Sequence, residues 1–249
     1  MTPAKSPSPR LFKTIFQARY APSLAFYARF AEAASEFENY PKWETTWNSV
    51  VRQDYAHMCS MIVRHDFLAY EQDNEDEELE KERVHQLLSD VPTALGIERF
   101  TRLGLRRRYL VPTGMAFSEL VSVFELKFMS PRHVDVPGVP SDLEDLMYRA
   151  DMRDGDDRFH IGLGPVHRDE LPLALGLNHD RHLDPSSPDQ LEIVLDSYPD
   201  VALFIDVDLY RDEDDCAVGV ANDFYKSACD RLSQIANGYA DYCFSQKVA

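Results

Sequence analysis

Two aspartates, Asp206 and Asp208, stand one residue apart in a stretch where aliphatic and other side chains alternate. The odd positions of residues 201–209 are all aliphatic, and this period of two predicts a β-strand with one buried face. Both carboxylates then project from the opposite face, with Cα atoms roughly 6.6 Å apart at about 3.3 Å rise per residue. Such a pair can share a metal ion, bind arginine side chains or face water.

The most basic segment of the chain, residues 99–109, is predicted to belong to another strand, which covers residues 97–111. Alternation places Arg102, Arg106 and Arg108 on one face of that strand. In a chain as acidic as this one, three guanidinium groups on one face require anions close by.

We expect these arginines to pair across the sheet with carboxylates on the same face, such as Asp206 and Asp208. Each cross-strand pair of this kind contributes roughly 0.2–1 kcal/mol to stability. The alternative is a pocket for a phosphate or carboxylate ligand, because the guanidinium fork binds both groups well. In that case the candidate ligand-binding residues are Arg102, Arg106, Arg108 and His160.

The Asp206-Val207-Asp208 segment also resembles, in residue type and placement, the metal-binding carboxylate pair of polymerase and cyclase palm domains. The resemblance implies a Mg²⁺ or Mn²⁺ site and two-metal phosphoryl transfer. The glycine-rich and third-acid companions of that pair cannot be assigned in this sequence. A metal-dependent phosphoryl-transfer enzyme or nuclease that uses Asp206 and Asp208 is therefore the alternative hypothesis.

Two other polar segments contain residue types that bind metals. Residues 151–157 hold four aspartates around a glycine but lack the terminal glutamate of an EF-hand. Residues 178–184 contain an HxxH pattern without the helical spacing of metalloprotease sites. We interpret both as solvated loops, and we interpret residues 212–215 as an acidic turn.

Composition limits the class of protein. The chain has 249 residues and a formal net charge of −17, so it repels nucleic-acid phosphates, and a nucleic-acid partner is not expected. No apolar run approaches the ~20 residues of a membrane helix, so no membrane association is expected. Residues 1–10, rich in proline and serine, predict a disordered tail, and four cysteines without a CxxC pair predict buried, reduced thiols in a cytoplasmic protein.

The elements that position the charged strands follow from hydrophobic periodicity and from turn residues. Strands are predicted at residues 11–20, twice within 45–70, and at 97–111, 159–163, 191–196 and 201–210; helices at 24–41, 74–90, 117–128, 141–148 and 223–246; and a long irregular loop at 165–188. Adjacent strands without intervening helices favour an α+β fold of two layers. We expect a mostly antiparallel sheet with helices on one face and a long C-terminal helix. Residues 11–249 then form a single domain, and two halves meeting near residues 111–114 are the alternative.

Short segments in the same order carry a resemblance to a known family. They are the opening strand, the helix that ends in Tyr40-Pro41, the Arg102-Leu103-Gly104-Leu105-Arg106 strand, and the Asp206-Val207-Asp208 strand before a long terminal helix. Over most of its length the chain thus resembles a sporadically distributed bacterial protein family of unknown function. That family usually reads RxGLRY followed by asparagine in the arginine strand, whereas here Arg107-Arg108 precedes Tyr109. The resemblance transfers no catalytic residue, and the patchy distribution of the family implies a mobile-element or defence-associated locus.

The leading hypothesis is a non-enzymatic binding protein that needs no cofactor. It presents the charged face of its sheet to a small anionic ligand or to a protein partner. A cavity between the sheet and the C-terminal helix, as in helix-grip folds, is a variant of this hypothesis. A structural or assembly subunit is the second alternative, and the sequence does not determine the oligomeric state.

Overall fold

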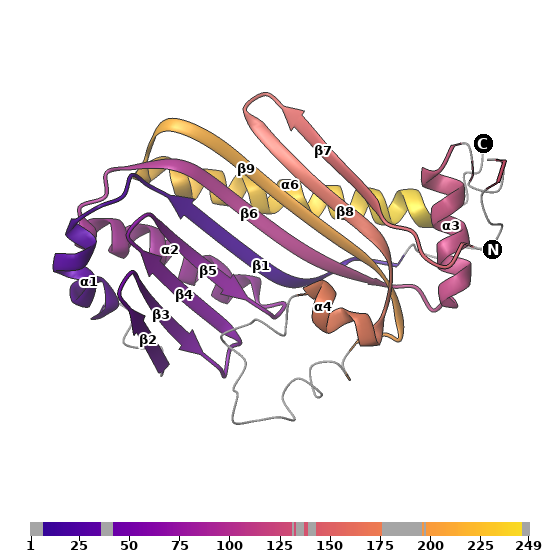
Figure 1. Ribbon diagram of the computed structural model, residues 1–249, viewed down its shortest axis with the longest axis horizontal. Helices are drawn as coiled ribbons and strands as arrows, with labels where there is room; N and C mark the ends of the chain where they lie inside the picture. The colour runs from indigo at the N-terminus through magenta and orange to yellow at the C-terminus, as the bar shows by residue number, and fades with distance from the viewer. Residues whose placement is uncertain are drawn as a thin grey trace.

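The computed structural model describes residues 7–35, 42–130, 132, 137–138, 143–175, 196 and 198–245. In this part of the chain nine strands form one sheet, in the order β2-β3-β4-β5-β1-β6-β9-β8-β7, and all neighbouring strands are antiparallel (Figure 1). The strands are β1 (Arg10–Arg19), β2 (Lys42–Thr46), β3 (Ser49–Asp54), β4 (Cys59–Arg64), β5 (Phe67–Gln72), β6 (Arg99–Pro112), β7 (Tyr148–Asp154), β8 (Asp157–His167) and β9 (Val201–Ala217). Strands from both sides of residues 111–114 therefore share one sheet.

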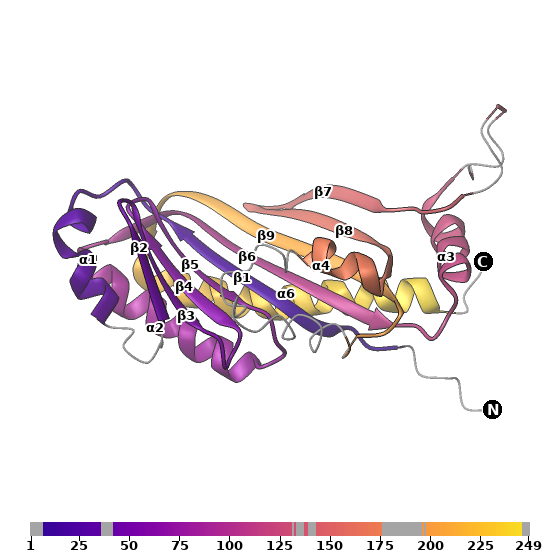
Figure 2. The ribbon, with the colours of Figure 1, turned by 60° about the horizontal axis from the view of Figure 1, so that its bottom comes forward.

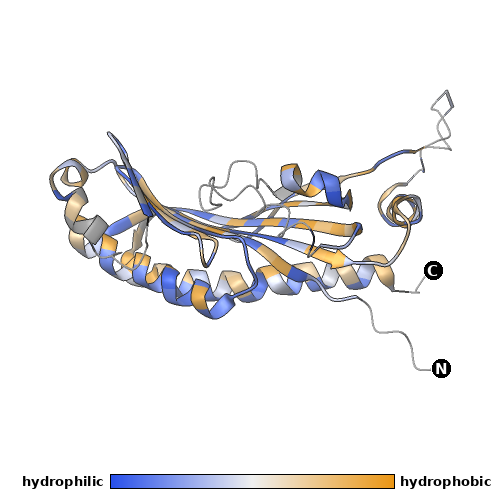
Figure 3. Cartoon of the chain, turned by 90° about the horizontal axis from the view of Figure 1, so that it is seen from below, coloured by the Kyte–Doolittle hydropathy of each residue, from blue (hydrophilic) through white to orange (hydrophobic). Residues whose placement is uncertain are grey.

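The two long helices lie together on one face of this sheet. The helices are α1 (Ala25–Ser35), α2 (Glu77–Leu95), α3 (Phe117–Phe128), α4 (Leu171–Leu175) and α6 (Val218–Phe244). Figure 2 shows α6 running along the sheet beneath β6 and β9, and Figure 3 shows α2 and α6 on the same side, with the short α4 on the opposite side. The predicted α+β architecture with a long C-terminal helix is confirmed.

The main core lies between the sheet and these two helices because each presents one apolar face to the other. In α6 the buried side chains recur at helical spacing, as the sequence predicts. Asp76 caps α2 by accepting a hydrogen bond from the Leu79 amide at 3.0 Å, and acidic residues fill the first turn. A second, smaller core cluster lies on the other face of the sheet and includes Phe12, Leu110, Leu171 and Phe204.

Four of the predictions are wrong in whole or in part where side-chain type was misleading. The two strands expected within residues 45–70 are β3 and β4, joined at residues 55–58, but the same range also contains parts of β2 and β5. Those two were missed because the turns at 47–48 and 65–66 contain neither glycine nor proline. Residues 151–157 are not an acidic loop but the ends of β7 and β8 with a turn at Gly155, whose φ is 60°. Residues 212–215 are not a turn, because β9 continues to Ala217. The proposed helix over 141–148 is also wrong, since Tyr148 begins β7.

The predicted loop at 165–188 is wrong at its start, where residues 165–167 complete β8 and α4 follows. Residues 176–188 of that loop and residues 191–195 of the predicted strand lie outside the described part of the chain, as do residues 1–6 of the predicted tail. Within the residues that the structure describes, no helix combines the length and apolar character that a membrane-spanning segment needs.

All four cysteines are free and buried, as the sequence predicts. Burial raises the pKa of the Cys229 thiol to about 11 and that of Cys243 to about 12. Both thiols are therefore protonated at neutral pH, which makes them poor nucleophiles.

An ion pair between β6 and α2 is enclosed in the main core. Arg107 points from β6 toward the helices, on the face opposite Arg106 and Arg108, and its side chain is 1% exposed. Its Nη2 donates to Glu80 Oε1 at 2.7 Å, and Glu80 on α2 is fully buried. Tyr225 on α6 donates to the same oxygen at 2.6 Å, and Thr14 on β1 donates to the other at 2.8 Å.

This network joins both helices to the centre of the sheet. Burial lowers the pKa of Arg107, but the charge of Glu80 and their hydrogen bond raise it by more, so the guanidinium stays charged. Burial and the same carboxylate raise the pKa of the Tyr225 hydroxyl, which stays a hydrogen-bond donor. Arg107, Tyr225 and Thr14 thus all donate hydrogen bonds to the Glu80 carboxylate.

Replacing Arg107 with leucine leaves the Glu80 carboxylate buried without its cation. We expect the free energy of unfolding to fall by about 3–5 kcal/mol, the usual cost of removing one partner of a buried ion pair. Urea unfolding followed by circular dichroism measures this loss as a lower midpoint.

The matched control is Arg10→Leu. Arg10 and Glu75 also form an ion pair, but their side chains are 51% and 54% exposed. This control should change the free energy of unfolding by less than about 1 kcal/mol. Equal losses in the two variants would contradict a special role for the buried pair.

Candidate functional site

The charged residues that the sequence singles out lie on the face of the sheet opposite α2 and α6. In the β6–β9 register Arg106 is opposite Asp208 and Arg108 is opposite Asp206. On the other side of β9, His160 of β8 is the register partner of Asp208. The intervening Val207 is fully buried on the helix side, so the predicted alternation of β9 is confirmed.

Asp206 is the common partner of two arginines. Arg106 Nε donates to Asp206 Oδ1 at 2.8 Å, and Arg106 Nη2 donates to Oδ2, which makes the pair bidentate. Arg108 Nε lies 3.4 Å from Oδ2 of the same carboxylate. These hydrogen bonds raise the pKa of Arg106. The expectation that the arginines pair across the sheet is confirmed for Arg106 and Arg108.

Asp208 has a different environment although it lies only two residues away. Among the described residues it has no hydrogen-bond or ion-pair partner. Burial raises its pKa, and the nearby charges of Arg106 and His160 lower it by less. The neutral, protonated form of Asp208 is thus more accessible than that of an ordinary aspartate.

These side chains surround a pocket of about 520 Å³. It is lined by Arg106, Arg108, Met147, Arg149, Ala150, Asp151, His160, Ile161, Gly162, Phe204, Asp206 and Asp208. All the candidate residues of the sequence except Arg102 therefore come together here. We call this hollow the polar pocket.

Arg102 lies beyond the polar pocket, at the next position along the same face. Its guanidinium is 3.9 Å from the ring centroid of Tyr210, and its Nη1 is 3.7 Å from Asp212. His160 stacks on Tyr210 at 5.2 Å between ring centroids, and its Nδ1 is hydrogen-bonded to Asp151. Tyr210 thus lies between Arg102 and the pocket.

The sequence-based hypothesis missed Arg149 and Asp151, which line the pocket from β7. Residues 151–157 were interpreted as a loop because of their aspartates, whereas Arg149, Asp151 and Arg153 alternate with a period of two. That alternation was the available signal for a strand. The backbone of β8 at Gly164 also lies close to the backbone at Leu146 and Met147. A Cβ built at Gly164 would lie only 2.9 Å from the Leu146 carbonyl oxygen.

The geometry of Asp206 and Asp208 does not favour a shared metal ion. In the described part of the chain no three His, Cys, Asp or Glu side chains gather closely enough to bind one. Asp206 instead offers its oxygens to two guanidinium groups. The HxxH segment at residues 178–184 lies outside the described residues.

Comparisons with known proteins leave the function open. No protein-family model matches the chain, and no curated protein matches it either. Among solved structures the chain is similar to "Methanococcus jannaschii TBP", with 10% sequence identity and a TM-score of 0.31, over 92% of this chain and 98% of that chain. A likeness this distant gives no basis for assigning a function.

The two aspartates should respond oppositely to neutralisation. The pKa of Asp208 is raised in the folded state above the ordinary value of 3.8, so its ionisation at pH 7 opposes folding. We therefore expect Asp208→Asn to raise the melting temperature at pH 7. The gain should shrink as the pH falls through the raised pKa, and should vanish below 3.8, where Asp208 is neutral in both states.

Asp206→Asn is the matched comparison, because it removes the carboxylate that two arginines share. We expect it to lower stability at pH 7 by about 1–2 kcal/mol, since both guanidinium groups are partly solvated. Thermal unfolding of both variants across pH 3–8 measures the two effects. A stabilising Asp206→Asn, or a gain in Asp208→Asn that does not depend on pH, would show that the electrostatic assignment is wrong.

Proposed function

We propose that this protein is a non-enzymatic binding protein that holds a small anionic ligand, a carboxylate or a phosphate, in the polar pocket. The observation that carries the proposal is the convergence of Arg106, Arg108 and Arg149 from two strands on one hollow of about 520 Å³. That volume lies in the range of small-molecule sites, roughly 300–1,000 Å³.

The charge balance of the pocket supports an anion once Asp208 is protonated. The lining contains three arginines and three aspartates, so the charges balance when every carboxylate is ionised, and one positive charge remains when Asp208 is neutral. Among the three arginines, Arg149 has a guanidinium whose described contact is a weak hydrogen bond to Met147 Sδ at 3.7 Å. Guanidinium forks bind carboxylate and phosphate oxygens in a bidentate geometry, which gives the site its preferred ligand class.

Asp208 makes the proposed binding sensitive to pH. When ionised, its carboxylate repels an anion in the pocket; when protonated, it can donate a hydrogen bond to that anion. Its raised pKa makes the protonated form more available. The affinity for an anion should therefore increase as the pH falls.

The experiment is calorimetric titration with inorganic phosphate and with citrate, using Arg149→Ala as the main variant. Arg149 is exposed, so its loss should not disturb the fold. We expect affinity to fall about tenfold or more, because a hydrogen bond from a charged donor contributes about 1.5–3 kcal/mol. Arg108→Lys should also weaken binding, because lysine keeps the charge but loses the fork.

The matched control is Arg158→Ala. Arg158 is exposed on the same face of the sheet but does not line the polar pocket. It should leave the affinity unchanged within about twofold after correction for long-range charge effects. Equal losses for Arg149→Ala and Arg158→Ala would reduce the proposal to unspecific attraction, and no saturable binding of either anion would overturn it.

Metal titration separates the proposal from the phosphoryl-transfer alternative. If the leading proposal holds, Mg²⁺ or Mn²⁺ should not raise the melting temperature, since Asp206 is occupied by Arg106 and Arg108. A rise with either ion that Asp206→Ala and Asp208→Ala abolish would favour the metal-dependent enzyme instead.

A further inference from the structure

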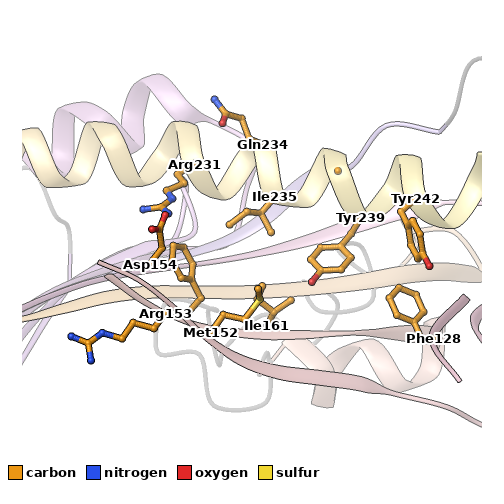
Figure 4. A pocket seen from close by; sticks show the side chains of 12 residues that line it. Phe128, Met152, Arg153, Asp154, Ile161, Arg231, Gln234, Ile235, Tyr239 and Tyr242 are labelled. Carbon is orange, nitrogen blue, oxygen red and sulfur yellow. The ribbon is translucent and has the colours of Figure 1, made fainter. Parts of the chain in front are cut away.

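A second hollow lies on the other face of the β7–β8 hairpin, between that hairpin and α6 (Figure 4). Its volume is about 710 Å³. It is lined by Phe128, Met152, Arg153, Asp154, Phe159, Ile161, Arg231, Gln234, Ile235, Gly238, Tyr239 and Tyr242. We call this hollow the aromatic cleft, and its lining shares only Ile161 with that of the polar pocket.

The walls of the aromatic cleft are large apolar side chains from three elements. Ile235, Tyr239 and Tyr242 point from α6 toward the strands, where Met152 and Ile161 face them (Figure 4). Phe128 of α3 closes one end, with its ring centroid 6.4 Å from that of Tyr239 and 5.5 Å from that of Tyr242. Met152 is 51% exposed and Tyr242 is 48% exposed, so part of this apolar wall is open to solvent.

Gly238 forms part of the helix wall of the cleft. It lies well inside α6, where glycine is less favourable than alanine by about 1 kcal/mol. Its conformation does not require glycine, and a Cβ built there would have no heavy atom within 4 Å apart from its own helix and its chain neighbours. The fold therefore does not need a glycine at this position, and a larger side chain there has open space to occupy.

The charges at the other end of the cleft cancel. Arg231 on α6 donates from Nη1 to Asp157 at 2.6 Å and from Nη2 to Asp154. Arg211 also binds Asp157, at 2.8 Å. Two guanidinium groups and two carboxylates thus neutralise one another. Arg153, the other charged residue of the lining, donates to the Gly155 carbonyl oxygen and points away from the rings (Figure 4), so no uncompensated charge lies among them.

The dimensions of the cleft limit its occupant. The lining residues of α6 run from Arg231 to Tyr242, which is about 16 Å at about 1.5 Å rise per residue. A volume of about 710 Å³ over that length leaves a cross-section of about 44 Å², or about 7 Å on a side. A partner helix with its side chains is about 10–12 Å wide and does not fit.

We propose that the aromatic cleft is a second ligand site, which binds an elongated, uncharged small molecule with a flat aromatic body. Flat rings pack in offset or edge-on geometry against the rings of Phe128, Tyr239 and Tyr242. The lack of an uncompensated charge among the rings separates this ligand from the anion of the polar pocket, and the narrow cross-section separates it from a helical protein partner.

The probe is N-phenyl-1-naphthylamine, an uncharged aromatic dye that fluoresces strongly only in apolar surroundings. The full chain should bind it saturably with one molecule per chain. Gly238→Leu, which places a side chain in the cleft, should weaken that binding at least tenfold. Met152→Ala removes an exposed part of the opposite wall and should weaken it severalfold without affecting the fold.

Gly219→Leu is the matched control. Gly219 is also a glycine of α6 with no heavy atom near an added Cβ, but it does not line the cleft. The Gly219→Leu variant should bind the dye with the same affinity as the unchanged chain. Dye binding that does not saturate, or that survives both Gly238→Leu and Met152→Ala, would overturn the proposal.

Two further measurements separate the alternatives. Binding of inorganic phosphate should be the same in Gly238→Leu and in the unchanged chain, so a failure of one site is not mistaken for a failure of the other. If Gly238→Leu changes the oligomeric state in light scattering and the dye does not bind, the cleft is a contact for a protein, and the small-molecule proposal is wrong.

Discussion

The ion pair between Arg107 and Glu80 is the interaction on which the rest of the structure depends. It lies in the main core and, through Tyr225 and Thr14, connects β6 and β1 to both long helices. A buried pair of this kind gives little net stability compared with hydrophobic residues of the same size. Removing either partner is nevertheless strongly destabilising, because the other charge then stays buried without a counter-charge. The helices must therefore dock where the carboxylate meets the guanidinium. We suggest that this requirement fixes how α2 and α6 sit on the sheet.

The same strand carries the charges of both faces. In β6, Arg107 points into the core while Arg106 and Arg108 point to the polar pocket, because neighbouring side chains of a strand alternate. A shift of one residue in the pairing of β6 would exchange the two sets and bury two unpaired guanidinium groups. The register is thus held from both sides, by Glu80 on the helix face and by Asp206 on the other.

Much of this arrangement could be predicted from the sequence, since alternation in β6 and β9 and helical spacing in α6 are strong local signals. The pairing of the β6 arginines with acids of β9 followed from charge and face alone, but the sequence did not indicate that Arg106 and Arg108 share Asp206. The partner of Arg107 did not, because Glu80 lies among several acids of α2 and only tertiary packing selects the one that is buried. Arg149 was missed for a different reason, since the aspartates that follow it in β7 suggested a loop. A cavity between the sheet and the C-terminal helix is a variant that the sequence allows, and the aromatic cleft lies there. Its lining residues had no signal, because the space between two elements depends on how they pack and not on the sequence of either one.

The β7–β8 hairpin forms a wall of both hollows. Arg149, Asp151 and His160 line the polar pocket, whereas Met152, Asp154 and Phe159 line the aromatic cleft. At the far side β7 is the last described strand of the sheet, so only β8 holds it by backbone hydrogen bonds. A rotation of the hairpin that narrows one hollow necessarily alters the other. A ligand that shifts the hairpin from one hollow therefore changes the affinity of the other hollow for its own ligand. The second ligand changes the affinity for the first by the same factor.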